Sequence, residues 1–263
     1  MQLLFIRHGD PDYKNDTLTE QGCIEAASLA KHIDYWKIDE SYISPLGRAR
    51  KTAEYSLEAM GLDVQNVIAT NTRDWLREFD GKVDVVTYPE FIEAYPDTEA
   101  TYGRLTKRIC WDMMPAYLNK HPEYYETWGW RDTEIASKSN IIEKYDNVCT
   151  EFDKLLADYG YVRDGMCYRV EKESDVTLAF FCHFGLTCVV MSHLCNMSPF
   201  ALWQGLSNAP TSVTQIFSEE REQGVASFRA WKVGDVSHLI QDGITPSFSA
   251  RFAEKYSNKN ERH

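Results

Sequence analysis

The chain has 263 residues, of which 43% are hydrophobic and 26% are charged, a composition typical of a globular protein with a packed core and not of a disordered one. Its formal net charge of −12 argues against a nucleic-acid-binding surface, because phosphate backbones are bound by basic patches. A small anionic substrate remains compatible with this charge, since a few converging arginines create a local positive pocket.

The sequence contains no apolar run of the roughly 20 residues that a membrane-spanning helix needs, and residues 1–6 lack the features of a signal peptide. Its seven cysteines are irregularly spaced and form no CxxC pair, which favours reduced thiols over a disulfide framework. We therefore expect a cytoplasmic protein that binds neither membrane nor nucleic acid. Cys182 lies beside a histidine, but the apolar run around it favours a buried thiol over a nucleophile or metal ligand.

The first predicted strand covers residues 2–6, a short apolar run that ends abruptly at Arg7-His8-Gly9. After a polar loop, Thr19 is suited to cap a helix, because apolar residues follow it at helical spacing. These residues are Ile24, Ala27, Ala30 and Ile33.

A short strand is predicted at residues 42–43. It leads into Ser44-Pro45, where Ser44 as the N-cap and Pro45 as the first helical residue predict a helix reaching about Met60. Residues 67–69 are the next predicted strand, and a polar segment that contains Glu78 follows them.

Residues 83–136 interrupt this alternation and are rich in aromatic side chains, most of which we expect to pack in a small core of their own. A long helix is predicted next, because six apolar residues share one of its faces. These are Ile141, Tyr145, Val148, Phe152, Leu155 and Leu156. The most apolar predicted strand, 176–181, then ends at His183.

A helix over about 186–195 and strands over about 212–219 and 226–232 complete the predicted elements. Strands that alternate with helices predict an α/β fold with a mostly parallel sheet. The sequence shows no internal repeat, no low-complexity tract and no linker that would divide the chain. We therefore expect a single domain.

Two apolar strands each end in a histidine, His8 and His183. Ligands of open α/β sheets bind beyond the carboxyl ends of the strands, so these side chains are candidates for one site. Arg7 lies beside His8, and Arg48 lies in the first turn of a predicted helix, where backbone N–H groups also favour an anion. Each residue alone is compatible with a structural or solvated role. Together they have the composition of a clamp for a dianion.

Several segments carry a further resemblance: Arg7-His8-Gly9, Leu18-Thr19-Glu20-Gln21-Gly22, the run from Ser44-Pro45-Leu46-Gly47-Arg48 to Ala53, Leu76-Arg77-Glu78, His183-Phe184-Gly185, Asn208 with Ser212-Val213-Thr214, and Ser237-His238-Leu239. In this order they resemble the histidine phosphatase superfamily, also called the phosphoglycerate-mutase-like family. The resemblance extends over nearly the whole chain and is weakest over residues 83–170. It implies a three-layer α/β/α sandwich in one domain, 1–263, with residues 83–160 as an inserted cap that covers the site.

The resemblance also implies roles for five residues. His8 corresponds to the nucleophile, Arg7, Arg48 and His183 to the phosphate pocket, with His183 also counted as catalytic, and Glu78 to the proton donor. The chemistry needs these residue types, since a neutral imidazole forms a covalent phosphohistidine and preorganised arginines stabilise the transferring phosphoryl group. Asp80 is the alternative proton donor. The spacing of acidic, histidine and cysteine residues indicates no metal site, and we expect no cofactor.

The implied activity is a phosphomonoesterase acting on a small phosphorylated metabolite. Two alternatives remain: a cofactor-dependent phosphoglycerate mutase, and a non-catalytic phosphate-binding protein of the same fold. The mutases typically follow Arg-His-Gly with a serine and, a few residues later, Trp-Asn, whereas this chain has Asp10-Pro11-Asp12-Tyr13-Lys14. This departure weakens the mutase interpretation. We expect selectivity to come from residues 83–136 and from the loops at 10–16 and 205–211.

Overall fold

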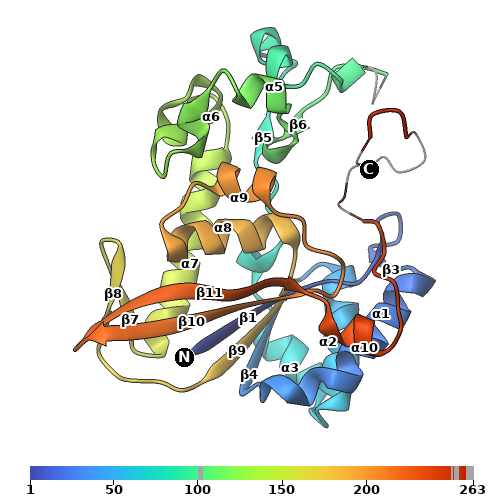
Figure 1. The fold of residues 1–263 in the computed structure, drawn as a ribbon, viewed down its shortest axis with the longest axis vertical. Helices are drawn as coiled ribbons and strands as arrows, with labels where there is room; N and C mark the ends of the chain where they lie inside the picture. The colour runs from blue at the N-terminus through green and yellow to red at the C-terminus, as the bar shows by residue number, and fades with distance from the viewer. Residues whose placement is uncertain (100–102, 250, 252–254, 259–263) are drawn as a thin grey trace.

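A computed structural model of the chain describes residues 1–99, 103–249, 251 and 255–258. Its centre is a seven-stranded sheet with the strand order β4-β9-β1-β10-β11-β8-β7 (Figure 1). The strands are β1 (Gln2–Arg7), β4 (Glu40–Ile43), β7 (Tyr161–Asp164), β8 (Cys167–Val170), β9 (Thr177–Cys182), β10 (Val213–Glu222) and β11 (Val225–Asp235). Two small ribbons pair β2 (Pro11–Asp12) with β3 (Thr17–Leu18), and β5 (Lys82–Val83) with β6 (Arg108–Ile109).

The sheet has a parallel core and an antiparallel extension. Strands β4, β9 and β1 run parallel, whereas β10, β11, β8 and β7 are each antiparallel to their neighbours. Tight connections explain two of these antiparallel pairs, because a hairpin can join only antiparallel strands. Glu222 pairs directly with Val225 across the β10–β11 turn, and Asp164 pairs with Cys167 across the β7–β8 turn. The predicted parallel arrangement therefore describes the three strands whose carboxyl ends lead to the candidate site residues.

Alternate residues of β1 enter two different cores, which is why this strand is apolar throughout. Leu3 and Phe5 belong to one hydrophobic cluster and Leu4 and Ile6 to the other. Successive side chains of a strand point to opposite faces, so a central strand covered on both faces needs a continuous apolar run.

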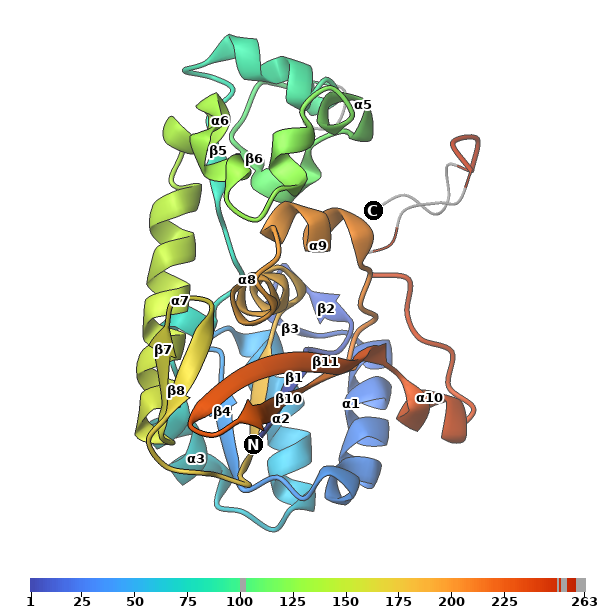
Figure 2. The same ribbon diagram turned by 60° about the vertical axis from the view of Figure 1, so that its left-hand side comes forward.

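Helices cover both faces and form the predicted three-layer sandwich (Figures 1 and 2). One face carries α1 (Glu20–His32), α2 (Gly47–Ala59) and α3 (Val64–Asn71), with α10 (Ser237–Gln241) beside α1. The other carries α7 (Ile141–Asp158) and α8 (Phe184–Cys195), with α9 (Pro199–Gly205) packed on α8. Within the described part of the chain, no helix combines the length and the apolar character that crossing a membrane requires.

The two most clearly predicted helices are confirmed. Thr19 caps α1, since its side chain accepts a hydrogen bond from the Gly22 backbone N–H at 3.0 Å. Gly22 is required there by a close approach, because a Cβ at this position would lie 2.2 Å from the Asp10 carbonyl oxygen. The long helix α7 buries all six residues of its predicted apolar face.

The predicted strand at 67–69 is wrong, because these residues lie in helix α3. Asp63 caps this helix by accepting a hydrogen bond from the Asn66 backbone N–H at 3.1 Å. The hydrophobic cluster that contains Leu4 and Ile6 also includes Ile68, with Val64 and Val67 packed against it. The spacing of three and four residues between these side chains is that of a helix face. A three-residue apolar run does not distinguish a strand from a helical stripe.

The predicted start of the second helix is also wrong. Helix α2 begins at Gly47 with Leu46 as its N-cap residue, two residues after the predicted position. The Gly47 backbone N–H donates to the Asp16 carboxylate at 2.7 Å, so the cap comes from another loop. The Ser44 hydroxyl instead contacts His183. Conversely, α8 begins at Phe184, before the predicted residue 186.

Most of residues 83–136 lie beyond one end of the sandwich (Figures 1 and 2). They form short 3₁₀ helices, η3 (Pro89–Ala94), η4 (Cys110–Asp112), η5 (Pro122–Tyr125) and η6 (Gly129–Asp132), and two short α-helices, α5 (Pro115–Leu118) and α6 (Glu134–Ser137). Tyr95, Tyr124 and Trp130 are buried, and they belong to the same hydrophobic cluster as the sheet residues Phe5 and Phe180. The aromatic side chains therefore extend the main core and do not form a separate one.

Candidate active site

The carboxyl ends of β1, β9 and β4 lie at one level of the sheet. Arg7 pairs with Cys182, and Ile43 pairs with Phe181, so the next residues of the three strands meet at one edge. The His8 and His183 ring centroids are 5.0 Å apart. Both histidines are almost completely buried, with exposed fractions of 2% and 0%. The predicted convergence of the two strand-end histidines is thus present in the structure.

The hydrogen bonds of His8 determine which ring nitrogen is protonated. Nδ1 lies 2.7 Å from the backbone oxygen of Gly9, which can only accept, so Nδ1 carries the hydrogen of a neutral ring. Nε2 is then unprotonated, and its lone pair accepts a hydrogen bond from the Nε–H group of Arg48 at 3.2 Å. Burial, together with the charges of Arg7 and Arg48, holds the pKa of His8 well below its ordinary value. At neutral pH the ring is therefore neutral, with Nε2 as its unprotonated nitrogen.

Arg48 is held beside His8 from two directions. It occupies the second position of α2, and its Nη1 donates to the Asp16 carboxylate at 2.9 Å. Its guanidinium also lies 5.4 Å from the centroid of the Tyr13 ring. Asp16 thus caps α2 and holds the arginine. Sequence reasoning did not single out Asp16, since the polar loop 10–16 gives no signal that distinguishes it from its acidic neighbours.

Arg7 is buried and its Nη1 donates to two backbone oxygens, that of Asn208 at 2.5 Å and that of Ser249 at 3.2 Å. Its Nε has no hydrogen-bond partner among the described residues. Burial lowers the pKa of Arg7, although nearby carboxylates, among them that of Glu78, partly oppose the shift. A buried cation with an unused donor is well suited to an incoming anion.

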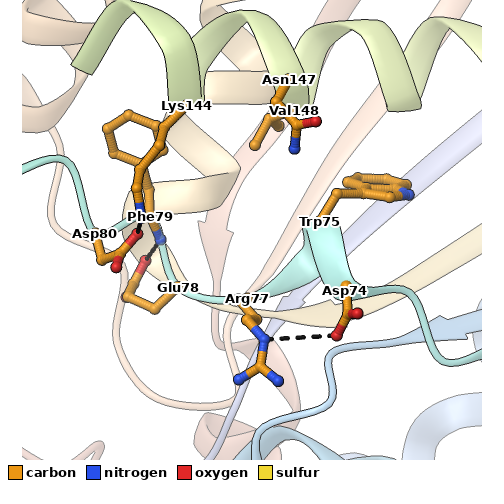
Figure 3. A pocket seen from close by; sticks show the side chains of 9 residues that line it. All are labelled: Asp74, Trp75, Arg77, Glu78, Phe79, Asp80, Lys144, Asn147 and Val148. Carbon is orange, nitrogen blue, oxygen red and sulfur yellow. Dashed lines mark hydrogen bonds and ion pairs between the residues drawn. The ribbon is translucent and has the colours of Figure 1, made fainter. Parts of the chain in front are cut away.

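Glu78, which precedes the aromatic-rich segment 83–136, reaches the amino-terminal end of α8. Its Oε1 accepts hydrogen bonds from the backbone N–H groups of Phe79 at 2.9 Å (Figure 3) and of Leu186 at 3.2 Å. Burial raises the pKa of Glu78 above its ordinary value, and Arg7 and Arg48 are near enough to oppose part of that rise. The structure thus brings this carboxyl close to His183 and both arginines.

Asp80, the alternative proton donor, forms an ion pair with Lys144 of α7 and is exposed (Figure 3). Both carboxylates line a small pocket of about 130 Å³ together with Asp74, Trp75, Arg77, Phe79, Lys144, Asn147 and Val148. Glu78 contacts the first turn of α8, beside His183, whereas Asp80 contacts α7. This difference favours Glu78 over Asp80 as the candidate proton donor.

The aromatic-rich segment 83–136 contacts the site through Trp111, which sequence reasoning did not single out. A Cβ built on Gly185 would lie 2.4 Å from the Trp111 ring and 2.8 Å from Glu78 Oε1. The indole and the carboxyl therefore share the space above the first turn of α8, where only glycine fits. Trp203 and Gln204 hold this region by donating to the backbone oxygens of Gly185 at 3.0 Å and Trp111 at 2.6 Å.

Cys182 is completely buried, and burial raises the pKa of its thiol to about 12. This environment keeps the thiol protonated and unreactive. Among the described residues, no group of three or more histidine, cysteine, aspartate or glutamate side chains is arranged to hold a metal ion.

Residues 3–109 match the sequence model described as histidine phosphatase superfamily (branch 1). A curated 2,3-bisphosphoglycerate-dependent phosphoglycerate mutase from Bartonella quintana (strain Toulouse) is 37% identical over 87 residues. That match covers 28% of this chain and 42% of the mutase, so it spans less than half the length of this relative.

Solved structures share the fold over most of the chain. A protein described as mycobacterial hydrolase 1 has a TM-score of 0.54 at 16% identity, covering 89% of this chain and 98% of that one. A mycobacterial glucosyl-3-phosphoglycerate phosphatase with inorganic phosphate has a TM-score of 0.53 at 17% identity, covering 90% and 98%. A mutant phosphoserine phosphatase from Entamoeba histolytica in complex with phosphoserine has a TM-score of 0.51 at 16% identity, again covering 90% and 98%. Residues 3–109 are thus similar in sequence to the histidine phosphatase superfamily, and the fold of most of the chain is similar to that of these solved structures.

Proposed function

We propose that this protein is a phosphomonoesterase that forms a phosphohistidine on Nε2 of His8. The observation that carries the proposal is the state of this imidazole. It is neutral and buried, its Nδ1 hydrogen is bound to Gly9, and its Nε2 lone pair lies 3.2 Å from the Arg48 Nε. A nucleophile and a cation that stabilises the transferred phosphoryl group thus lie side by side.

The proposed reaction has two displacements. In the first, the Nε2 lone pair of His8 forms a bond to phosphorus, the ester P–O bond breaks, and the Glu78 carboxyl gives its proton to the leaving oxygen. In the second, the Glu78 carboxylate takes a proton from water, the water oxygen bonds to phosphorus, and the P–N bond breaks to release phosphate. Arg7, Arg48 and His183 would bind the three outer phosphoryl oxygens throughout.

The raised pKa of Glu78 supports its role, because a general acid must hold its proton near the working pH. The substrate class that we propose is a small phosphorylated metabolite. In support, the names of two proteins of similar fold are glucosyl-3-phosphoglycerate phosphatase and phosphoserine phosphatase.

Phosphoglycerate mutase is the second candidate, and the 37% identity to a mutase over 87 residues favours it. A phosphatase and a mutase differ in whether water or a second substrate takes the phosphoryl group from the histidine. The Asp10-to-Lys14 loop, which lacks the serine and the Trp-Asn of the mutases, favours the phosphatase. A panel of phosphomonoesters that includes 3-phosphoglycerate with 2,3-bisphosphoglycerate separates the two activities.

Brief incubation with a labelled phosphomonoester should leave acid-labile, base-stable phosphate on His8, detected by peptide mapping after a base quench. The His8→Ala variant is the control and should remain unlabelled. Label on a serine or on Cys182 would contradict the mechanism. Binding of phosphate without any label or turnover would favour the non-catalytic alternative.

A further inference from the structure

The Ser44 hydroxyl has no part in the reaction as proposed, yet it is completely buried at the edge of the site. Its backbone N–H donates to the Phe181 oxygen at 2.9 Å, which continues the β4–β9 pairing and fixes the residue in place. Its Oγ lies 2.7 Å from Nε2 of His183. The same Oγ accepts a hydrogen bond from the Leu46 backbone N–H at 3.3 Å.

We propose that Ser44 is a positioning residue whose hydroxyl donates to Nε2 of His183 and so fixes the ring in the tautomer that carries its hydrogen on Nδ1. The inference rests on the proposed function, since it gives Nδ1–H the task of donating to a phosphoryl oxygen. Burial and nearby positive charges lower the pKa of His183, so the ring is neutral and has a single hydrogen to place.

The partners of Ser44 decide between the two tautomers. If Nε2 carried the hydrogen, Ser44 Oγ would face two donors, Nε2–H and the Leu46 N–H, and the described residues would offer its own hydrogen no acceptor. If Nδ1 carries the hydrogen, Ser44 donates to Nε2 and accepts from Leu46, so both bonds form. Each tautomer leaves one buried donor without an acceptor among the described residues, the Ser44 hydroxyl in the first and Nδ1–H in the second. The first also leaves the buried Nδ1 lone pair without a donor, so the second leaves fewer buried polar groups unpaired and is favoured.

Nδ1 of His183 is the ring nitrogen that is left to contact a ligand. Nδ1 has no hydrogen-bond partner among the described residues, although the ring is fully buried 5.0 Å from His8. A phosphoryl oxygen can only accept, so it binds a protonated Nδ1 and is repelled by the lone pair of a bare one. Ser44 thus converts a neutral histidine into a donor for the transition state without requiring a positive charge on the ring.

The test begins with the wild-type protein, selectively labelled with ¹⁵N-histidine. Long-range ¹H–¹⁵N spectra at neutral pH should show His183 with a protonated Nδ1 and a bare Nε2, with the resonances assigned by a His183→Asn variant. Saturating inorganic phosphate should shift the Nδ1 resonance and leave the tautomer unchanged. A protonated Nε2 in the wild type would overturn the proposal, whatever the variants do.

Variants add the kinetic readout. Ser44→Ala should give a mixture of tautomers and lower kcat for p-nitrophenyl phosphate by roughly tenfold to a hundredfold, less than the loss of a direct transition-state donor. Ser44→Thr, which keeps the hydroxyl, should restore the Nδ1–H tautomer. Ser41→Ala is the matched control, because Ser41 is buried in β4, the strand that Ser44 directly follows, and its hydroxyl has no partner among the described residues. This control should have wild-type kcat.

A folded Ser44→Ala protein with wild-type tautomer would overturn the proposal, whether its kcat is normal or low. If Ser44→Ala does not fold, the wild-type and Ser44→Thr spectra still show which tautomer of His183 is present, and this tests the proposal. Failure of the proposed function has a separate signature, because it would appear as absence of label on wild-type His8 and would leave the tautomer measurement unaffected.

Discussion

Arg48 and Arg50 lie two positions apart on α2 but have different environments. Arg48 is buried and donates to His8 and Asp16, whereas Arg50 is exposed. Residues two apart on a helix do not share a face, so only one of them reaches the site. At the scale of single residues, the proposed chemistry therefore depends on particular side chains and not on the positive charge of the helix as a whole.

Arg48→Ala should lower kcat by roughly a hundredfold or more, because it removes one preorganised donor to the transition state. Arg50→Ala is the matched control, and it should leave kcat within about twofold of the wild type. Steady-state kinetics on one phosphomonoester compares the two. Equal losses would show that Arg48 acts through the charge of the helix and not through His8.

Glu78→Gln should slow hydrolysis of an alkyl phosphate at least roughly tenfold more than that of p-nitrophenyl phosphate. The nitrophenolate leaves without help from a proton, whereas an alkoxide does not, so the ratio of the two rates reports on the general acid. Single-turnover kinetics should be used, because hydrolysis of the phosphohistidine must not limit either rate.

Asp80→Asn is the control for this comparison, since Asp80 is exposed and paired with Lys144. This variant should lower the hydrolysis rates of both esters by the same small factor. If the leaving-group effect appears in Asp80→Asn and not in Glu78→Gln, the two carboxylates have been assigned the wrong way round.

At the scale of elements, three helix starts show how caps determine the boundaries. Thr19 caps α1 and Asp63 caps α3, each from the position directly before its helix. For α2, the Asp16 carboxylate accepts the Gly47 N–H from a loop 31 residues earlier in the chain. The first two caps are local. The third depends on the tertiary fold, and it joins the start of α2 to the position of Arg48.

Asp63→Ala should lower the free energy of unfolding by about 1 kcal/mol, the usual cost of losing an N-cap side chain. Urea unfolding followed by circular dichroism measures the difference. Asp63→Asn keeps an acceptor and should cost much less, and Gln65→Ala, at an exposed position of α3, is the control. An unchanged midpoint in Asp63→Ala would mean that the cap does not stabilise this helix.

At the scale of the whole molecule, α10 connects the end of the sheet to the site. His238 of α10 lies 3.0 Å from the Thr211 hydroxyl, and the Thr211 backbone N–H donates to the His8 oxygen at 3.2 Å. Burial lowers the pKa of His238 to about 4, although Asp235 and Asp242 oppose part of the shift and His32 adds to it. Helix α10 therefore packs against the Thr211 segment through a histidine that is neutral at pH 7.

This arrangement predicts a stability that depends on pH. The unfolded chain binds a proton at His238 near pH 6.5, whereas the folded protein does so only near pH 4, so acidification between these values favours unfolding. Between pH 7 and pH 5 this one group should lower the free energy of unfolding by roughly 2 kcal/mol.

His238→Asn should reduce the pH dependence of stability by that amount, measured by urea unfolding at pH 7 and pH 5. The comparison uses the difference between variant and wild type, because the lowered pKa values of His8 and His183 act in the same direction and the raised values of Glu25 and Glu78 oppose them. Identical pH profiles in the two proteins would show that His238 does not titrate differently in the folded and unfolded states.

The sequence by itself determined the strands that end at His8 and His183, the helices α1 and α7 and the alternation of strands and helices that predicts an α/β fold. These follow from local apolar patterns and local caps, which are readable within short windows. The same patterns failed at 67–69, where three apolar residues suit either a strand or a helix, and gave no prediction of the β7–β8 hairpin.

Only the tertiary structure decided how the site is assembled. Asp16 reaches Gly47 and Arg48, Ser44 contacts His183, and Glu78 accepts from Leu186. The partners in these four contacts are 31, 32, 139 and 108 residues apart in the chain. A polar side chain in a loop carries no local sign of such a distant partner. The strand ends were predictable because periodicity is local, whereas the residues that contact the candidate site residues became visible only once the chain had folded.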